Sequence, residues 1–253
     1  MSDEVKQKVI DSFSKNTEAY VTSSTHKNQS DLDLITEWLQ PERSWTVLDI
    51  ATGGGHVAKE LSRSAGSVIA TDLTKDMLEN TARHLHGIHN IQFVIADAEQ
   101  LPFLDGTFDA VTCRIAAHHF PNPDLFIHEV QRVLKPSGRF LMIDNIAPEQ
   151  EELDSFYNTF EKMRDPSHAR ALNISEWKQL MEPFNIEKEL PRKKRLPFQD
   201  WLKRKVDDPD TKNRVQQYFL EASEEAKRYF SIEQGDQRIL SFAIDEWMVM
   251  AKK

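Results

Sequence analysis

The sequence has little cysteine, no long apolar run and a deficit of positive charge. Cys113 is the only cysteine, so no disulfide can form within the chain, and a reducing, cytoplasmic environment is expected. An apolar run of about 18 residues is missing, and the polar N-terminus lacks the apolar segment of a signal peptide. We therefore expect no membrane insertion. The net charge of −9 argues against nucleic acid as a partner.

Positive charge gathers in one place, the segment PRKKR at 191–195. Such a segment can contact phosphate, but it is more often a solvated strand end or loop. We expect the second case here.

What the sequence does contain is an alternation of strand and helix patterns. Hydrophobic residues make up 39% and charged residues 29%, a composition typical of a soluble globular protein. The first 40 residues are predicted to be helical, with Pro41 just beyond the end of a helix. Helical segments then alternate with short apolar runs, which predicts βαβ units and a parallel sheet with helices on both faces. The predicted strands are 45–51, 67–72, 91–97, 108–115 and 139–146.

After Pro148 the pattern changes to helices, predicted at 149–164, 175–182, 199–206 and 211–229. Two further strands are predicted, at 184–190 and 242–251. We interpret most of this region as a cap built onto the late strands of the sheet. The expected organisation is therefore an N-terminal arm or lid over 1–40, an α/β core over 41–147, and a cap with the last strands, in the same domain, over 148–253.

A glycine loop follows the first predicted strand in VLDIATGGGHVA, residues 47–58. Gly53, Gly55 and Ala58 fit the dinucleotide-binding pattern G-x-G-x-x-A, and Asp72 ends the next strand at the spacing expected for a carboxylate that binds ribose hydroxyls. Taken alone, this pattern is compatible with a nicotinamide cofactor.

Asp49 points to a different ligand. It lies at the carboxyl end of the first strand, where ligands of open α/β sheets bind. A carboxylate there would repel a pyrophosphate by about 4 kcal/mol at 4 Å and intermediate dielectric. It would attract a ligand that carries an ammonium and a sulfonium, and the carboxylate of that ligand could lie near the helix N-terminus after Gly55. S-adenosylmethionine has these charges.

The same residues carry a family resemblance. VLDIATGGG is similar to the first motif of class I S-adenosylmethionine-dependent methyltransferases, and Ala51 in place of the commonest first glycine resembles the UbiE-like branch, the C-methyltransferases of quinone biosynthesis. IATDLTKDMLENT, VIADAEQLPFLDGTFDAV and EVQRVLKPSGRFLMID resemble the motifs that follow, so the resemblance covers residues 30–146.

The resemblance implies a fold and a set of cofactor-binding residues. The fold is a doubly wound, mostly parallel sheet of seven strands, the last one antiparallel, with an inserted helical cap. Asp72 would bind the ribose hydroxyls, Leu73 would flank the adenine, and Asp97 would accept from the adenine amino group. The residues expected to bind S-adenosylmethionine are Asp49, Ala51, Thr52, Gly53, Gly55, Asp72, Leu73, Met77, Asp97, Ala98 and Arg114.

The candidate catalytic residues lie in TCRIAAHHFPNP, residues 112–123, after the fourth strand. Arg114 could orient an acidic substrate or contact the cofactor carboxylate. His118 or His119 could act as general base, and because adjacent side chains seldom point the same way, at most one of them is expected to face the substrate. The alternative is that both histidines only pack against the loop or form hydrogen bonds within it. No metal site is expected, either at these histidines or at HLHGIH, residues 84–89.

Two further pairs of residues are candidates for contacts with the substrate or the lid. His168 and Arg170 lie in a segment, 163–180, that resembles an uncharacterised bacterial UbiE-like subgroup, and Tyr20 and His26 lie in the arm that folds over the cofactor in similar enzymes. The Gly-Leu-Arg-Asn-Val element of true quinone methyltransferases is missing after the fourth strand, so a quinone acceptor is doubtful.

The expected function is methylation of a small molecule by in-line substitution. A nicotinamide-dependent oxidoreductase and a non-catalytic S-adenosylmethionine-binding protein stay open as alternatives. The sequence also leaves open the acceptor atom, which could be O, N, C or S, and a homodimer.

Overall fold

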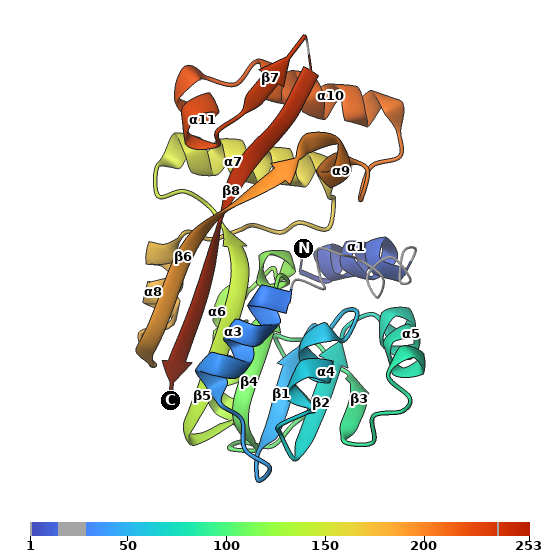
Figure 1. Ribbon diagram of the computed structural model, residues 1–253, viewed down its shortest axis with the longest axis vertical. Helices are drawn as coiled ribbons and strands as arrows, with labels where there is room; N and C mark the ends of the chain where they lie inside the picture. Colours follow the sequence, from blue (N-terminus) through green and yellow to red (C-terminus); the bar gives the residue numbers. More distant parts are fainter. Residues whose placement is uncertain (1, 15–28, 237) are drawn as a thin grey trace.

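The computed structural model describes residues 2–14, 29–236 and 238–253, and it consists of a central sheet flanked by helices with a second helical layer beyond one end (Figure 1). The strand order is β3-β2-β1-β4-β5-β8-β6, with β7 paired to β8. The strands are β1 (Thr46–Ile50), β2 (Ser67–Asp72), β3 (Ile91–Ile95), β4 (Phe108–Arg114), β5 (Leu134–Ile146), β6 (Asn185–Pro197), β7 (Glu233–Gly235) and β8 (Arg238–Lys252).

The sheet has the α/β topology expected from the sequence. Strands β1 to β5 pair in parallel, and β8 lies antiparallel between β5 and β6. The reversal of strand order next to β1 opens a crevice at the carboxyl ends of β1 and β4, where ligands of such sheets bind. The doubly wound, mostly parallel sheet is thus confirmed, and the short β7 is the strand beyond the expected seven.

Helices cover both faces of the sheet, because alternate side chains of each buried strand point to opposite sides. In β1, Val47 packs in one core with α3 and α4, whereas Leu48 and Ile50 pack in another with α6 and α8. The helices of these layers are α3 (Gln29–Leu39), α4 (His56–Leu61), α5 (Lys75–His84), α6 (Pro123–Val133) and α8 (Ile174–Leu180).

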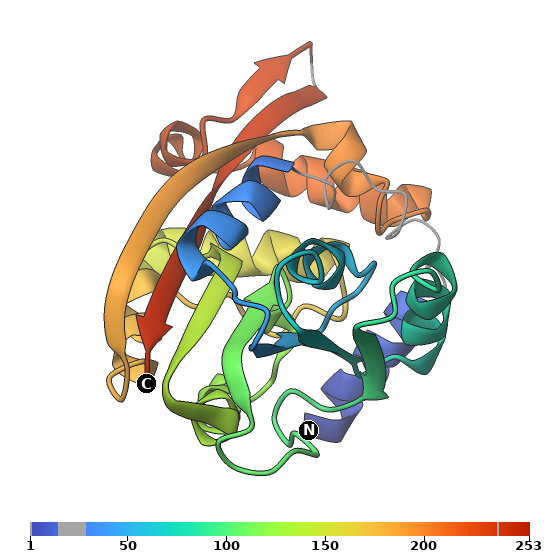
Figure 2. The same ribbon diagram turned by 60° about the horizontal axis from the view of Figure 1, so that its bottom comes forward.

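A third core lies in the cap, above the sheet in Figure 1. It is rich in aromatic side chains, and Phe160, Phe219 and Phe242 meet there with ring centroids 4.8 to 5.6 Å apart. Strands β6 and β8 are long enough to run from the cap to the far end of the sheet (Figures 1 and 2). The cap helices are α7 (Glu151–Arg164), α9 (Phe198–Leu202), α10 (Pro209–Leu220) and α11 (Glu224–Tyr229).

The remaining elements lie between sheet and cap. Helix α1 (Ser2–Ser14) lies beyond the ends of the strands, on the cap side of α4 and α5 (Figure 1). The 3-10 helix η1 (Ala117–His119) follows β4 directly. Both elements therefore lie beside the crevice.

Several predicted boundaries differ from the structure, most clearly those of β5, β6 and the last cap helices. β5 begins at Leu134, ahead of the strand predicted over 139–146, because the chain pairs with β4 on both sides of a bulge. β6 continues to Pro197 and so includes the basic segment. The helix expected over 211–229 is two helices, because Ser223 accepts a hydrogen bond from the backbone N–H of Ala226 and starts α11.

Candidate active site

A cavity opens at the crevice where the sequence analysis placed the cofactor. It is bounded by the strand-end segments after β1, β2, β3 and β4 and by one face of α1. The residues that line it are Lys6, Val9, Phe13, Asp49, Ile50, Ala51, Thr52, Gly53, Gly54, His56, Val57, Asp72, Leu73, Thr74, Ala96, Asp97, Ala98, Glu99, Arg114, Ile115, Ala116, His119, Phe120 and Pro121.

The glycine loop needs a backbone conformation that side chains disfavour. Gly53 and Gly55 have φ values of 52° and 73°, and Ala51 has φ of 51° without being a glycine. The left-handed backbone at Ala51 is a physical reason why glycine suits this position. At Gly55, which caps α4, a Cβ atom would lie 2.5 Å from Cγ2 of Thr81, so the close packing of α4 on α5 requires glycine.

Asp49 is buried beneath this loop. Its two carboxylate oxygens accept hydrogen bonds from the Thr52 hydroxyl at 2.6 Å and from the Thr112 hydroxyl at 2.8 Å. Burial raises the pKa of Asp49 to about 6, against the hydrogen bonds from the threonines, which lower it. A positively charged group bound next to Asp49 would therefore lower its pKa and favour the fully ionised carboxylate.

Asp72 and Asp97 end the next two strand segments and line the same cavity. Asp72 accepts from the backbone N–H of Gly53 at 3.1 Å and of Thr74 at 2.9 Å, so it holds the glycine loop in place. Burial raises the pKa of Asp72 above its usual value. Asp97 accepts from the Lys6 ammonium at 2.6 Å, and Glu99 lies 2.6 Å from the same ammonium.

Other residues expected to bind the cofactor are divided between the cavity and the core. Leu73 and Ala98 line the cavity, as does Thr52. Met77 is 1% exposed and lies outside the cavity lining, so it packs as a core side chain.

Helix α1 covers the cavity with one face. Lys6, Val9 and Phe13 follow each other at helical spacing and all line the cavity. The ring of Phe13 meets the ring of His119 edge to face at 5.2 Å. Tyr20 and His26, the arm residues singled out in the sequence, lie outside the described residues.

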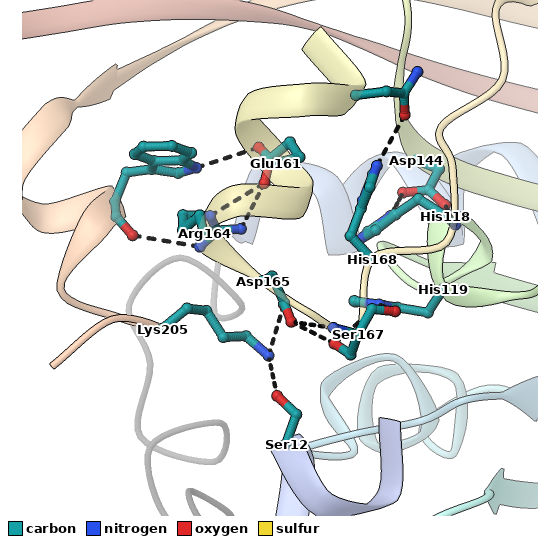
Figure 3. A network of polar contacts seen from close by, with 12 residues as sticks. Ser12, His118, His119, Asp144, Glu161, Arg164, Asp165, Ser167, His168 and Lys205 are labelled. Atoms are coloured by element: carbon teal, nitrogen blue, oxygen red, sulfur yellow. Dashed lines mark hydrogen bonds and ion pairs between the residues drawn. The ribbon is translucent and has the colours of Figure 1, made fainter. Parts of the chain in front are cut away.

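The two adjacent histidines have different surroundings, which Figure 3 shows. His118 is held by Asp144, whose carboxylate accepts from its backbone N–H at 3.0 Å and lies 2.6 Å from its Nδ1. His119 lines the cavity, and its Nδ1 lies 3.0 Å from the carbonyl oxygen of Ser167. The expectation that one histidine faces the substrate side therefore points to His119.

The charges of these histidines differ as well. Burial lowers the pKa of His118, but the Asp144 carboxylate outweighs burial and raises it above its usual value. Burial and the neighbouring His118 lower the pKa of His119 well below its usual value, and the same two causes lower that of His168 to about 4. His119 and His168 are thus neutral at pH 7.

Arg114 lines the cavity and forms an ion pair with Asp31 of α3 at 2.8 Å. Asp31 is 1% exposed and also pairs with Arg192 of β6 at 2.6 Å. Arg192 in turn pairs with Glu246 of β8 at 2.6 Å. Arg114 is therefore the cavity end of a buried ion network that ties α3 to the sheet.

The cap residues His168 and Arg170 lie outside the cavity lining. His168 Nε2 lies 2.9 Å from Oδ1 of Asn158, and Arg170 pairs with Asp154 and Glu176 at 2.8 Å each. In the structure both side chains therefore contact other cap residues.

The basic segment of β6 is matched by acids along its length. Beyond Arg192, the pairs are Lys193 with Asp245 at 3.0 Å, Lys194 with Glu246 at 3.4 Å and Arg195 with Glu233 at 3.0 Å. This segment thus lies within a strand and is held by ion pairs to its neighbours, whereas a strand end or loop was expected from the sequence.

The described ranges contain no group of three or more His, Cys, Asp or Glu that could hold a metal ion. Within the same ranges, no helix has the length and apolar character needed to cross a membrane.

Sequence reasoning missed several residues of the site. Lys6 and Phe13 could have been suspected from their shared helix face, but their contacts lie about 90 residues or more along the chain. Asp144 had a clearer signal, because an acid within the apolar strand FLMIDNI needs a buried partner. That partner is His118.

Comparison with known proteins agrees with this geometry. A family model described as a methyltransferase domain matches residues 48–142. The uncharacterized methyltransferase YcgJ of Bacillus subtilis is 38% identical over 224 residues, which cover 87% of this chain and 88% of that protein. The ubiquinone/menaquinone biosynthesis C-methyltransferase UbiE of Brucella abortus is 37% identical over 134 residues, 50% of each chain. Among solved structures, protein BH2331 of Bacillus halodurans C-125 has a TM-score of 0.86 and 39% identity, and the match covers 88% of this chain and 99% of that one.

These relations extend well beyond the glycine loop. YcgJ is related over most of its length, and UbiE over half. They do not favour the nicotinamide oxidoreductase that the loop alone allowed, and they identify the cofactor as S-adenosylmethionine. The chain belongs to the class I S-adenosylmethionine-dependent methyltransferases, with UbiE-like enzymes among its relatives.

Proposed function

We propose that this enzyme methylates a small molecule, and that the acceptor binds next to His119 in the cavity beneath α1. The observation that carries the proposal is the composition of this one cavity. Its lining includes the strand-end acids Asp49, Asp72 and Asp97 as well as the neutral imidazole of His119. A cofactor bound to the acids would thus share a closed space with a group able to take a proton.

The residues present fit the cofactor chemically. The Asp49 carboxylate suits an ammonium group, and the bare backbone of Gly53 and Gly54 allows the methionyl chain to come close. Asp72 has acceptor capacity left for ribose hydroxyls beyond its two backbone hydrogen bonds. The Asp97 carboxylate can accept a hydrogen bond from the adenine amino group. For this, Lys6 must either donate to the same carboxylate at the same time or move away from it.

When bound, the cofactor supplies a methyl group on a positively charged sulfur, which the acceptor takes by in-line substitution. The protein has to hold the acceptor in line, exclude water and, where the acceptor carries a proton, remove it. His119 is placed for the last task, because its ring lines the cavity and is neutral at pH 7. His118 is instead committed to Asp144 through both its ring and its backbone.

The division of the chain follows from these roles. Within the arm expected over 1–40, we assign α1 to a lid that covers the cavity, whereas α3 packs on the sheet. We assign residues 41–147 to the cofactor-binding core. Residues 148–253 supply the cap and the last strands of the same domain. The cover of α1 over the cavity favours a small acceptor over a folded protein or a duplex.

The proposal is tested by finding where the methyl group goes. The purified enzyme is incubated with S-adenosylmethionine labelled in the methyl group and with a bacterial extract, which is then separated by molecular size. We expect label in the low-mass fraction, and none there with the Asp72→Asn variant. Enzyme-dependent label in the protein or nucleic-acid fraction would contradict the proposal.

A further inference from the structure

The segment Asp165–Arg170 wraps around the two adjacent histidines. The backbone N–H groups of Ala169 and Arg170 donate to the carbonyl of His118 at 2.9 and 3.2 Å. The carbonyl of Ser167 lies 3.0 Å from Nδ1 of His119. The segment Asp165–Arg170 thus contacts the histidine pair mainly through its backbone, while Nε2 of His168 lies 2.9 Å from Oδ1 of Asn158 in the cap.

This segment is a tight turn organised by Asp165, in which Asp165, Ser167 and His168 are buried (Figure 3). Oδ1 of Asp165 accepts from the backbone N–H of Ser167 at 3.0 Å and from its hydroxyl at 2.5 Å. The backbone N–H of His168 donates to the carbonyl of Asp165 at 2.9 Å. On its other side, Asp165 pairs with Lys205 at 2.9 Å. These contacts fix the direction of the Ser167 carbonyl.

The two oxygens of Ser167 near His119 can only accept from the imidazole. A carbonyl oxygen has no proton to give, and the Ser167 hydroxyl, 3.4 Å from Nδ1 of His119, already donates its proton to Asp165. Nδ1 of His119 must therefore carry the hydrogen. In a neutral imidazole the second nitrogen, Nε2, is then left with its lone pair.

The surroundings of His119 keep the ring neutral. The charged or titratable groups that act on it are His118 beside it, Lys205 after α9 and Asp165 at the start of the turn. Phe13 of α1 packs against the ring. Burial and the two cations oppose a positive charge on His119, whereas Asp165 and the hydrogen bond to the Ser167 backbone favour one; burial and the cations prevail, and the pKa of His119 is lowered. His119 is therefore in its neutral form.

We propose that the Asp165–His168 turn positions His119 in its Nδ1–H tautomer, so that Nε2 is the basic nitrogen presented to the methyl acceptor. This rests on the proposed function for the role of His119, but the tautomer itself does not depend on it. Asp165 and Ser167 act through His119 and are positioning residues. In the step they support, the acceptor atom forms its bond to the methyl carbon as the bond from that carbon to the cofactor sulfur breaks, which leaves S-adenosylhomocysteine. The acceptor proton passes to Nε2 of His119, and the imidazolium returns it to solvent afterwards.

The test is long-range proton–nitrogen NMR of the histidine side chains at about pH 7, with His119 assigned by the His119→Gln variant. We expect Nδ1 of His119 to give the signal of a nitrogen that carries hydrogen, and Nε2 that of one that does not. Asp165→Asn keeps an oxygen for the Ser167 N–H and hydroxyl, so the same pattern is expected. Asp165→Ala removes this oxygen, so we expect a second tautomer of His119 or a protonated His119 ring. Asp200→Asn, which breaks the exposed pair with Lys203, is the matched control.

The outcomes separate the inference from the proposed function. An Nε2–H or protonated His119 in the unmodified protein would overturn the inference, even if no variant folds. A pattern left unchanged by Asp165→Ala would overturn the role of the turn. S-adenosylhomocysteine is titrated into the same samples: failure to bind counts against the proposed function and leaves the tautomer result standing.

Discussion

Asp49 provides a quantitative prediction, because its ionisation should be linked to cofactor binding. In the structure its pKa is raised to about 6, mainly by burial. A ligand with an ammonium group next to Asp49 binds the ionised form, so binding lowers this pKa and releases a proton. If the protonated form does not bind, about 97% of the sites are competent at pH 7.5 and about 9% at pH 5.

The expected result is that the affinity for S-adenosylhomocysteine falls about tenfold between pH 7.5 and pH 5, a loss of about 1.4 kcal/mol. Asp49→Asn should bind weakly at both pH values and without this pH dependence, because it keeps the shape but not the titrating group. Calorimetric titration in buffers of different ionisation enthalpy measures both the affinity and the proton release. An unmodified protein with equal affinity at both pH values, or a variant with normal affinity, would refute the reasoning.

Three further perturbations test other parts of the structure. Lys6→Met should tighten S-adenosylhomocysteine binding about fivefold at low salt, because Lys6 then no longer competes with the cofactor for Asp97. Calorimetric titration measures the affinity, and weaker binding would instead make Lys6 a residue that holds the cofactor. Gly55→Ala should lower the free energy of unfolding in urea by about 1–3 kcal/mol, because the alanine Cβ would lie 2.5 Å from Cγ2 of Thr81. A change below about 0.5 kcal/mol would contradict the packing argument. His168 has a pKa lowered to about 4, so the unfolded state binds more protons below pH 6.5 and stability should fall by up to about 3 kcal/mol as the pH drops toward 4. His168→Gln should lack this part of the loss in urea unfolding measured across that range, and an unchanged pH dependence would show that His168 does not titrate in this way.

The parallel part of the fold could be predicted because its signals are local. Each strand from β1 to β4 is a short apolar run, and the acids Asp49, Asp72 and Asp97 stand at or just beyond strand ends, so topology alone brings them together. The glycine loop and its backbone demands are likewise contained in a few consecutive residues. For these elements the pattern and the tertiary structure favour the same result.

Other parts depend on contacts that no local pattern contains. The length of β6 comes from ion pairs to acids of β8 and β7, about 40 to 50 residues away, which stabilise a strand of mostly charged residues. The start of β5 depends on a bulge opposite β4, with Ser137 at φ of 65°. The break between α10 and α11 is different, because Ser223 followed by two glutamates is an N-cap signal that the sequence did offer.

The site shows the same division. The pair His118–His119 marked the right place, but the choice between them required knowing that Asp144 and Ser167 lie on either side. Lys6 reaches Asp97 across 91 positions of sequence, a contact that only the packing of α1 creates. Residues that position or cover a site were therefore harder to predict than residues that line it.

The most direct test of the account is a crystal structure of the enzyme with S-adenosylhomocysteine bound. We expect the ribose hydroxyls on Asp72, the ammonium group beside Asp49 and the sulfur turned toward the space next to His119. A ligand whose sulfur faces away from His119, or which binds outside the cavity beneath α1, would contradict it.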